Sequence, residues 1–282
     1  MTVSTNTIQV KEMEKIAVGV RKRLMRLIFE ARAGHTGGSL SSVDILVALY
    51  FGILRLKPDD PKWEDRDRFI LSKGHSVEGY YCVLAQAGFF TEEILSTYGQ
   101  FNSILAGHPT VKVPGVEVNS GALGHGLSVG TGMAISFTRD RRNSRVFVLM
   151  GDGEQGEGSI MEAANAAGHY KLENLTAIID RNRLQISGNT EDVMALDSLE
   201  SRWSSYGWAV KQVDGNHIGD LVACFKNLPV EKSRPSLIIA NTTKGKGVSF
   251  IENKAAWHHR VPDEQQYLQS IHELNQRLEE IN

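Results

Sequence analysis

The fold is decided by the segment Val146-Phe147-Val148-Leu149-Met150-Gly151-Asp152-Gly153-Glu154-Gln155-Gly156. A continuous apolar run ends here in a glycine-rich turn, which predicts a fully buried strand at 146–150. A helix is expected next at 159–170, and a second apolar strand at 175–180. Strand, helix and buried strand in succession are typical of a parallel sheet that helices cover on both faces.

The rest of the chain continues this pattern. Further strands are expected at 68–71, 208–213 and 237–241, and helices at 8–32, 43–54, 218–228 and 263–280. We therefore expect an α/β fold with a doubly wound, mostly parallel sheet. No internal repeat, low-complexity tract or linker interrupts the chain, so residues 1–282 are expected to form a single domain.

Composition excludes several classes of protein. The 31 basic and 33 acidic residues among 282 give a net charge of −2, which offers no positive field for nucleic acid. The longest apolar run, 45–54, is half of a membrane span, and the polar first ten residues lack the core of a signal peptide. Cys82 and Cys224 are expected to be reduced thiols. We expect a cytoplasmic protein without nucleic-acid or membrane partners.

Glycine is the one compositional outlier, with 27 residues. The glycines gather in groups that are expected to be loops: 34–38, 74–79, 121–132, 151–158 and 245–247. Two of these groups directly follow predicted strands, where α/β sheets bind their ligands. Histidines stand in the same segments, namely His35, His75, His108 and His125. This combination favours a binding site over simple turns.

The segment from Gly151 to Gly156 matches the GxGxxG pattern of dinucleotide sites, with Asp180 available for a ribose hydroxyl. Asp152 argues against a bare pyrophosphate in this turn. Two anions about 4 Å apart, at an effective dielectric near 20, repel each other by about 4 kcal/mol. A divalent cation between them removes the conflict, and Mg²⁺ readily shares phosphate oxygens.

The next strand ends with Asp180-Arg181-Asn182, at the same edge of the sheet as Asp152. The amide oxygen of Asn182 and the backbone carbonyl of Leu184 can complete an oxygen ligand set with the Asp152 carboxylate. The sequence therefore favours a cation–diphosphate site, and a capped turn with solvated charges remains the alternative.

Gly151-Asp152-Gly153, followed thirty residues later by Asp180-Arg181-Asn182, resembles the thiamine-diphosphate fingerprint. The chain as a whole, from about 12 to 262, resembles the amino-terminal, thiamine-diphosphate-binding part of transketolases. Matching segments are Gly34-His35, Ser39-Leu40, Leu71-Ser72-Lys73-Gly74-His75, Gly107-His108-Pro109, Pro114-Gly115-Val116-Glu117-Val118, Gly121-Ala122-Leu123-Gly124-His125-Gly126, Thr242-Thr243-Lys244-Gly245-Lys246-Gly247 and Trp257-His258. Ser-Lys-Gly-His with Gly-His-Pro favours transketolase over deoxyxylulose-phosphate synthase.

The resemblance implies a role for individual residues. Ligands of Mg²⁺ would be Asp152, Asn182 and the Leu184 carbonyl. Residues that bind thiamine diphosphate would be His75, Gly121, Ala122, Leu123, Gly151, Gly153, Asn182, Lys244 and His258. Catalytic residues around the reacting carbons and sugar hydroxyls would be His35, His108 and His258, and residues at an inter-chain contact would be Glu157 and Glu162. His259 receives no role here, and that of His125 stays open.

The resemblance also implies a reaction and a partner. Transketolases transfer a two-carbon ketol unit from a ketose to an aldose, often as phosphates, and a glutamate of the pyrimidine-binding domain activates the cofactor. No second set of βα units follows Trp257-His258. We therefore expect the N-terminal subunit of a split transketolase, without pyrimidine-binding and C-terminal domains. A separate chain would supply them, with two copies of each chain in an α₂β₂ heterotetramer.

Two other functions stay open at this point. One is an NAD-dependent oxidoreductase that uses the GxGxxG segment, and the other is a non-catalytic, cofactor-carrying subunit. Within the enzyme class, a deoxyxylulose-phosphate synthase and a transketolase specialised for another sugar or a sulfosugar also stay open. The residues do not identify the donor or the acceptor.

Overall fold

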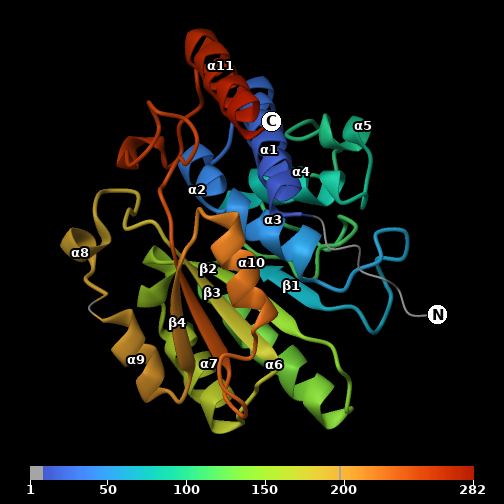
Figure 1. Cartoon of the computed structure of the whole chain (residues 1–282), viewed down its shortest axis with the longest axis vertical. Helices are drawn as coiled ribbons and strands as arrows, with labels where there is room; N and C mark the ends of the chain where they lie inside the picture. The colour runs from blue at the N-terminus through green and yellow to red at the C-terminus, as the bar shows by residue number, and fades with distance from the viewer. Residues whose placement is uncertain (1–8, 197) are drawn as a thin grey trace.

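A parallel sheet forms the centre of the molecule (Figure 1). In the computed structural model, which describes residues 9–196 and 198–282, it has five strands in the order β1-β2-β3-β5-β4. The strands are β1 (Arg68–Leu71), β2 (Val146–Gly151), β3 (Leu175–Arg181), β4 (Ala209–Asp214) and β5 (Ser236–Asn241). Every neighbouring pair is parallel. The predicted α/β class is confirmed, and each strand lies within one residue of its expected bounds.

Helices cover both faces of the sheet, as a doubly wound fold requires. The first face is covered by α1 (Val10–Ala31), α3 (Val43–Gly52), α4 (Val77–Gln86) and α10 (Ile218–Lys226). The second face is covered by α6 (His125–Arg139), α7 (Gly158–His169) and α9 (Leu199–Ser205). Along β2, Phe147 and Leu149 point to the first core, and Val148 and Met150 point to the second.

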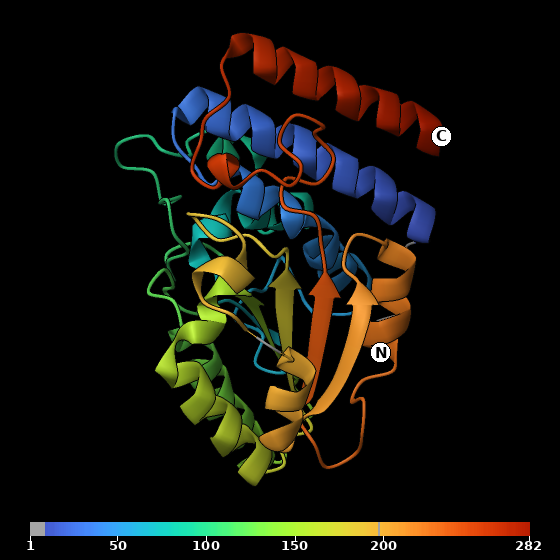
Figure 2. The same ribbon diagram turned by 90° about the vertical axis from the view of Figure 1, so that its left-hand side faces the viewer.

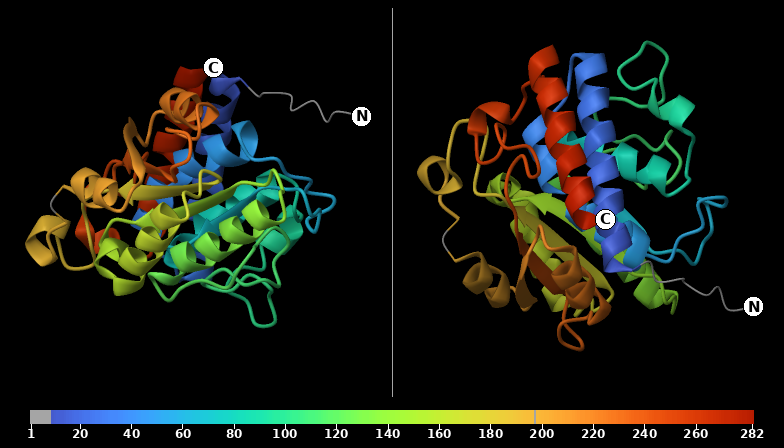
Figure 3. Two further views of the ribbon diagram at one scale, coloured as in Figure 1. Left: turned by 90° about the horizontal axis from the view of Figure 1, so that it is seen from below. Right: turned by 45° about the horizontal axis from the view of Figure 1, so that its top comes forward.

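Helix α2 (Thr36–Ser41) is buried along its whole length. The other α-helices of the described residues are α5 (Glu92–Leu95), α8 (Thr190–Val193) and α11 (Glu264–Ile281). Helix α11 lies alongside α1, which separates it from the sheet (Figure 2). Seen from below, α1 and α11 lie on one side of the sheet, and α6 and α7 lie on the other (Figure 3, left).

One expectation about the glycines was wrong. The segment 121–132 was expected to be a loop, but α6 begins at His125 and contains Gly126, Gly130 and Gly132. A Cβ at Gly130 would lie 2.6 Å from Cγ2 of Val148, and one at Gly126 would lie 2.5 Å from Cβ of Ser72. These two glycines therefore let a helix approach the sheet closely. Gly37 and Gly38, also assigned to a loop, lie in α2.

The expectations for the first residues of the chain cannot be compared with the structure, which describes residues 9–196 and 198–282. Residues 1–8, which include most of the polar amino-terminal segment and the first residue of the helix expected at 8–32, lie outside the described residues. In the described part, no helix combines the length and apolar character needed to cross a membrane. Cys82 and Cys224 are buried free thiols, as expected. The single-domain assignment stays a prediction.

The strands end together and so bring distant loops to one edge of the sheet. Gly151 is in register with Asp180, and Asp180 is in register with Ala240 on β5. The loops after β1, β2, β3 and β5 therefore begin side by side, although they are far apart in the sequence. This carboxyl edge is where parallel α/β sheets place their ligands.

Candidate functional site

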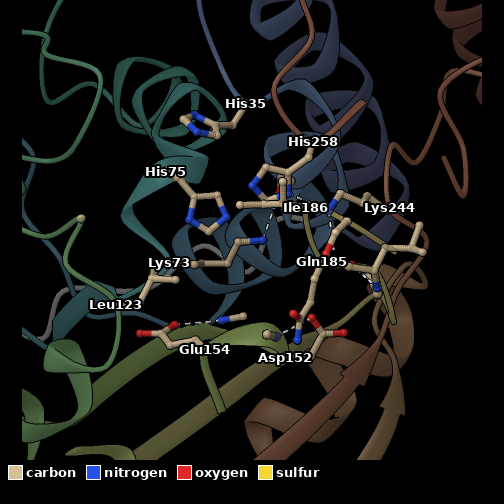
Figure 4. A pocket seen from close by; sticks show the side chains of 17 residues that line it. His35, Lys73, His75, Leu123, Asp152, Glu154, Gln185, Ile186, Lys244 and His258 are labelled. Atoms are coloured by element: carbon tan, nitrogen blue, oxygen red, sulfur yellow. Dashed lines mark hydrogen bonds between the residues drawn. The ribbon is translucent and has the colours of Figure 1, made fainter. Parts of the chain in front are cut away.

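A cavity of about 380 Å³ opens at the carboxyl edge of the sheet (Figure 4). Its volume lies in the usual range for small-molecule sites. It brings together the following predicted residues: His35, His75, Gly121, Leu123, Gly151, Asp152, Gly153, Asn182, Leu184, Lys244 and His258. They come from segments throughout the chain, which the fold brings together around one cavity, and the roles expected for them stay predictions.

Asp152 lies at the floor of the cavity, directly after β2, and is only 2% exposed. Its Oδ1 accepts a hydrogen bond from the backbone N–H of Gly153 at 2.8 Å, and Oδ2 accepts one from the N–H of Arg183 at 2.6 Å. Burial and the nearby Asp180 raise the pKa of Asp152. A bound cation would oppose both effects and stabilise the carboxylate.

The other two expected metal ligands lie beside Asp152. Oδ1 of Asn182 accepts a hydrogen bond from the N–H of Leu184 at 3.1 Å, which fixes the turn after β3. The Leu184 carbonyl in turn accepts a hydrogen bond from Nζ of Lys244 at 3.1 Å. A carboxylate, an amide and a carbonyl are hard oxygen donors of the kind Mg²⁺ prefers.

The fit of a cation can be tested on the structure itself. The Lys244 ammonium is 1% exposed and is held by the Leu184 carbonyl, so a positive charge already occupies this side of the cavity. Within 9–196 and 198–282, no group of three or more His, Cys, Asp and Glu side chains could hold a metal by itself. The predicted set has only one carboxylate, so it needs further oxygens, which a diphosphate would supply. The residues fit Mg²⁺ bound together with a diphosphate.

An ion pair that the sequence did not predict borders the cavity, whose lining includes Lys73. Nζ of Lys73 contacts the carboxylate of Asp180, which is completely buried, and donates a hydrogen bond to the carbonyl of Gly38 at 3.0 Å. Asp180 also accepts hydrogen bonds from Ser41 and Thr242. Burial opposes its ionisation, but Lys73 and these hydrogen bonds keep its pKa below the usual value. Asp180 is therefore fully engaged and unavailable to a ribose hydroxyl.

Histidine rings form the wall opposite Asp152 (Figure 4). The ring centroid of His35 lies 5.3 Å from that of His75, 5.7 Å from His258, 6.2 Å from His108 and 4.5 Å from His259. His259, which received no role from the sequence, thus belongs to this cluster. Its neighbours His258 and Trp257 were the only signal that could have found it.

The environment keeps His35, His75 and His258 neutral. Burial, followed by the nearby His259, lowers the pKa of His35 to about 4. Burial, followed by the Lys244 ammonium, lowers the pKa of His258 to about 3. Burial and Lys73 also lower the pKa of His75. Each ring therefore offers one N–H donor and one nitrogen acceptor near neutral pH, which suits recognition of hydroxyl groups.

A family model described as "Transketolase, thiamine diphosphate binding domain" matches residues 13–274. The chain belongs to the transketolase family. This membership confirms the predicted family, the thiamine-diphosphate-binding fold and the transferase class. It also excludes the dinucleotide interpretation of the GxGxxG segment, in agreement with the burial of Asp180.

Two relatives show how far the likeness extends. One of the subunits of the apulose-4-phosphate transketolase of Phocaeicola vulgatus is 52% identical over 273 residues, which cover 97% of each chain. The 6-deoxy-6-sulfo-D-fructose transketolase subunit SqwG of a Clostridium species is 37% identical over 256 residues, covering 90% of this chain and 93% of the relative.

Solved transketolases have the same fold over almost the whole chain. The enzyme from Campylobacter jejuni matches with a TM-score of 0.88 and 26% identity, over 94% of this chain and 43% of its own. The enzyme from Pichia stipitis, in complex with sedoheptulose 7-phosphate, matches with a TM-score of 0.84 and 28% identity, over 97% and 44%. The chain thus spans less than half the length of these transketolases.

Four predicted residues do not line the cavity of this transketolase chain. His108 is exposed but lies beside the wall, since a Cβ at Gly121 would be 2.7 Å from its Cδ2. Ala122 is exposed between two residues that do line it. Glu157 and Glu162 are exposed at the start of α7 and within it. Their expected roles stay predictions.

Other lining residues carried no functional signal in the sequence. Glu154 is 2% exposed and accepts hydrogen bonds from the N–H groups of Gly124 at 2.8 Å and Gly151 at 3.0 Å. It therefore ties the segment around Leu123 to the end of β2. The loop residues Gln185, Ile186 and Ser187 also line the cavity, and Ile186 is 74% exposed.

Proposed function

We propose that this chain is the N-terminal subunit of a heteromeric transketolase. With a partner chain, it binds thiamine diphosphate and Mg²⁺ and transfers a two-carbon ketol unit from a ketose or ketose phosphate to an aldose or aldose phosphate. The observation that carries this proposal is the cavity in which the oxygen donors Asp152, Asn182 and Leu184 face a cluster of neutral histidines.

The two ends of the cavity have different chemistry. Asp152, Asn182 and the Leu184 carbonyl would hold Mg²⁺, while Lys244 and the backbone of Gly153 would bind the diphosphate. Thiamine diphosphate, when bound, supplies the nucleophilic carbon with which carbon–carbon bonds are cleaved and formed. The protein contributes binding, orientation and proton transfer.

His258 connects the two ends. Its Nδ1 lies 2.9 Å from Nζ of Lys244, and an ammonium can only donate hydrogen bonds. Nδ1 of His258 is therefore the acceptor, and its other ring nitrogen carries the proton and can donate to a substrate oxygen. His35, with a pKa of about 4, is equally neutral and can accept a hydroxyl proton or share one with a sugar.

We assign the rest of the active site to a separate chain. That chain would supply the pyrimidine-binding domain with its glutamate and the C-terminal domain, in an α₂β₂ complex in the cytoplasm. Support comes from the Phocaeicola relative, which this chain matches over 97% of both lengths and whose name describes it as one subunit of a transketolase. Glu157 is exposed and lies next to Gly124, where a Cβ would be 2.7 Å from its own Cβ. A partner that contacts Glu157 and Glu162 would therefore reach the Leu123 side of the cavity.

The relatives also favour one class of substrate. At 52% identity over nearly the whole chain, a phosphorylated ketose of the apulose 4-phosphate type is the first candidate donor. A sulfosugar such as 6-deoxy-6-sulfofructose is the second candidate, supported by 37% identity. Both sugars carry the ketol group that the proposed reaction requires.

Reconstitution tests this function. The chain and the product of a neighbouring reading frame of similar size are purified separately and mixed with thiamine diphosphate, Mg²⁺, a candidate ketose phosphate and an aldose phosphate. We expect ketol transfer only from the mixture. Full activity of this chain alone would reject the split, and a calorimetric titration without thiamine diphosphate binding to the complex would reject the cofactor assignment. NADH serves as the control ligand and is expected not to bind.

A further inference from the structure

Glu78 is a buried carboxylate that the proposed chemistry does not use. It lies in the first turn of α4, and its exposed fraction is 0%. Its Oε1 accepts hydrogen bonds from the backbone N–H of His35 at 3.1 Å and from the hydroxyl of Tyr98 at 2.9 Å. Its Oε2 accepts one from the hydroxyl of Ser39 at 2.6 Å. All three donors are neutral.

A charge-bearing group in this environment is costly to bury. The three hydrogen bonds and the N-terminal end of α4 offset part of this cost. The chain is also shaped to bring the carboxylate close to the loop. Gly34 has a φ of +149°, and a Cβ there would lie 2.8 Å from Oε1 of Glu78. Only glycine therefore permits the contact between Glu78 and His35.

Tyr81, also on α4, contacts the backbone of a second histidine, His108. The hydroxyl of Tyr81 donates a hydrogen bond to the backbone carbonyl of His108 at 3.1 Å. Glu78 and Tyr81 are three residues apart and so share one face of the helix. This face thus holds the backbones of the His35 and His108 loops, whose rings lie 6.2 Å apart.

We propose that Glu78, assisted by Tyr81, is a positioning residue that sets His35 and His108 against each other on the substrate side of the cavity. The inference rests on the proposed function, which defines that side. Asp152, Asn182 and Lys244 come from other loops and make no contact with Glu78 among their hydrogen bonds. Loss of Glu78 should therefore weaken use of the ketose and leave cofactor binding intact.

The kinetic test uses the reconstituted heteromer. In Glu78→Ala we expect KM for the donor ketose to rise by about tenfold. A change of this size corresponds to the loss of one hydrogen bond that orients the substrate. Affinity for thiamine diphosphate with Mg²⁺, measured by calorimetry, should stay within about twofold. Glu78→Gln should restore KM, because its amide oxygen can still accept from His35 while its NH₂ group donates to the Ser39 hydroxyl.

Matched tyrosine variants keep the test informative if Glu78→Ala fails to fold. Tyr98→Phe removes one hydroxyl from Glu78, and Tyr81→Phe removes the bond to His108. Tyr80→Phe is the control on the same helix, because its hydroxyl bonds only to Tyr50 and to the Gly115 carbonyl among the described residues. The first two variants should raise KM, and the control should not.

Amide hydrogen exchange gives a readout that is independent of catalysis. In the wild-type chain the His35 amide is bonded to Glu78, so its exchange should accelerate in Glu78→Ala and Tyr98→Phe but not in Tyr80→Phe. Unchanged exchange at His35 in Glu78→Ala would overturn the positioning role, as would a loss of cofactor affinity with unchanged KM. Absence of ketol transfer in the wild-type heteromer would overturn the proposed function instead.

Discussion

Nζ of Lys244 lies 2.9 Å from Nδ1 of His258. The same ammonium donates to the Leu184 carbonyl, so its two hydrogen-bond acceptors are both neutral. Burial, followed by the Lys73 ammonium, lowers the pKa of Lys244 to about 8, which leaves it mostly charged near neutral pH. Among the residues that the structure describes, no carboxylate contacts Lys244 directly, so this buried cation remains available to an incoming anion. Lys244 therefore links the Leu184 side of the cavity, where the diphosphate is proposed to bind, to His258 in the histidine wall.

Replacement of Lys244 tests this link. Lys244→Met should weaken binding of thiamine diphosphate with Mg²⁺ by about 10- to 100-fold, because a hydrogen bond to a charged group contributes about 1.5–3 kcal/mol. Calorimetry on the complex measures the change. Lys246→Met is the control, since Lys246 lies two residues away and pairs with Glu252 at 3.6 Å. Equal loss of affinity in both variants would contradict a specific role for Lys244.

The carboxylate of Asp152 is expected to make cofactor binding dependent on Mg²⁺. In Asp152→Asn the amide oxygen can still accept one backbone hydrogen bond, so the fold should persist while the Mg²⁺ dependence disappears. Titrations of thiamine diphosphate with and without Mg²⁺ check this, together with a thermal melt. Arg181 pairs with Asp152 at 3.3 Å and with Glu191 at 2.5 Å, so Glu191→Gln serves as control, since the Glu191 side chain is 44% exposed. A variant with wild-type Mg²⁺ dependence would refute the metal role.

The strands of this fold could be predicted from the sequence almost to the residue. Runs such as 146–150 are apolar at every position, only five residues long and followed by glycine, which favours a strand buried on both faces over a buried helix. The position of the cavity-lining turn after β2 could be predicted too, because Gly151-Asp152-Gly153 directly follows an apolar run, and its role in holding a metal stays a prediction.

Helix α6 was missed because Gly126 and Gly130 stand among the apolar residues Leu127, Ala134 and Phe137 that it packs against the sheet, and a glycine-rich segment indicates a loop. The buried polar pairs were equally invisible. Lys73 and Asp180 are 107 positions apart and meet only because β1 and β3 end at the same edge of the sheet. Glu78 looks like an ordinary exposed residue of a helix until α2 and the Tyr98 segment cover it.

Stability of the chain should fall as the solution is acidified. The pKa of His35 is about 4 and that of His258 about 3 in the folded state, against 6.5 for an unperturbed histidine. The unfolded chain therefore binds more protons between about pH 6.5 and 4, so the free energy of unfolding decreases as pH falls through this window. Both rings are only half-buried, and solvent screening reduces the effect.

Urea unfolding at pH 7, 6 and 5 checks this dependence. His35→Gln and His258→Gln should each flatten it, whereas His272→Gln, a change at an exposed position of α11, should not. The comparison between variants is needed because two buried carboxyls oppose the histidines. Burial raises the pKa of Glu78 and of Glu154, so protonation of these groups raises the free energy of unfolding as the pH falls. Identical slopes in the wild type and both site variants would refute the prediction.

Two helical glycines should respond to alanine in opposite ways. Gly19 lies inside α1, and a Cβ there would meet nothing within 4 Å. Gly19→Ala should therefore stabilise the chain by about 0.5–1 kcal/mol through the lower conformational entropy of the unfolded state. Gly79 lies inside α4, where a Cβ would be 3.1 Å from the carbonyl oxygen of Ser39. Gly79→Ala should separate α2 from α4 and lower stability, because this contact is with backbone. Urea midpoints measure both changes, and a shift of the same sign in the two variants would disprove the role of close helix packing at Gly79.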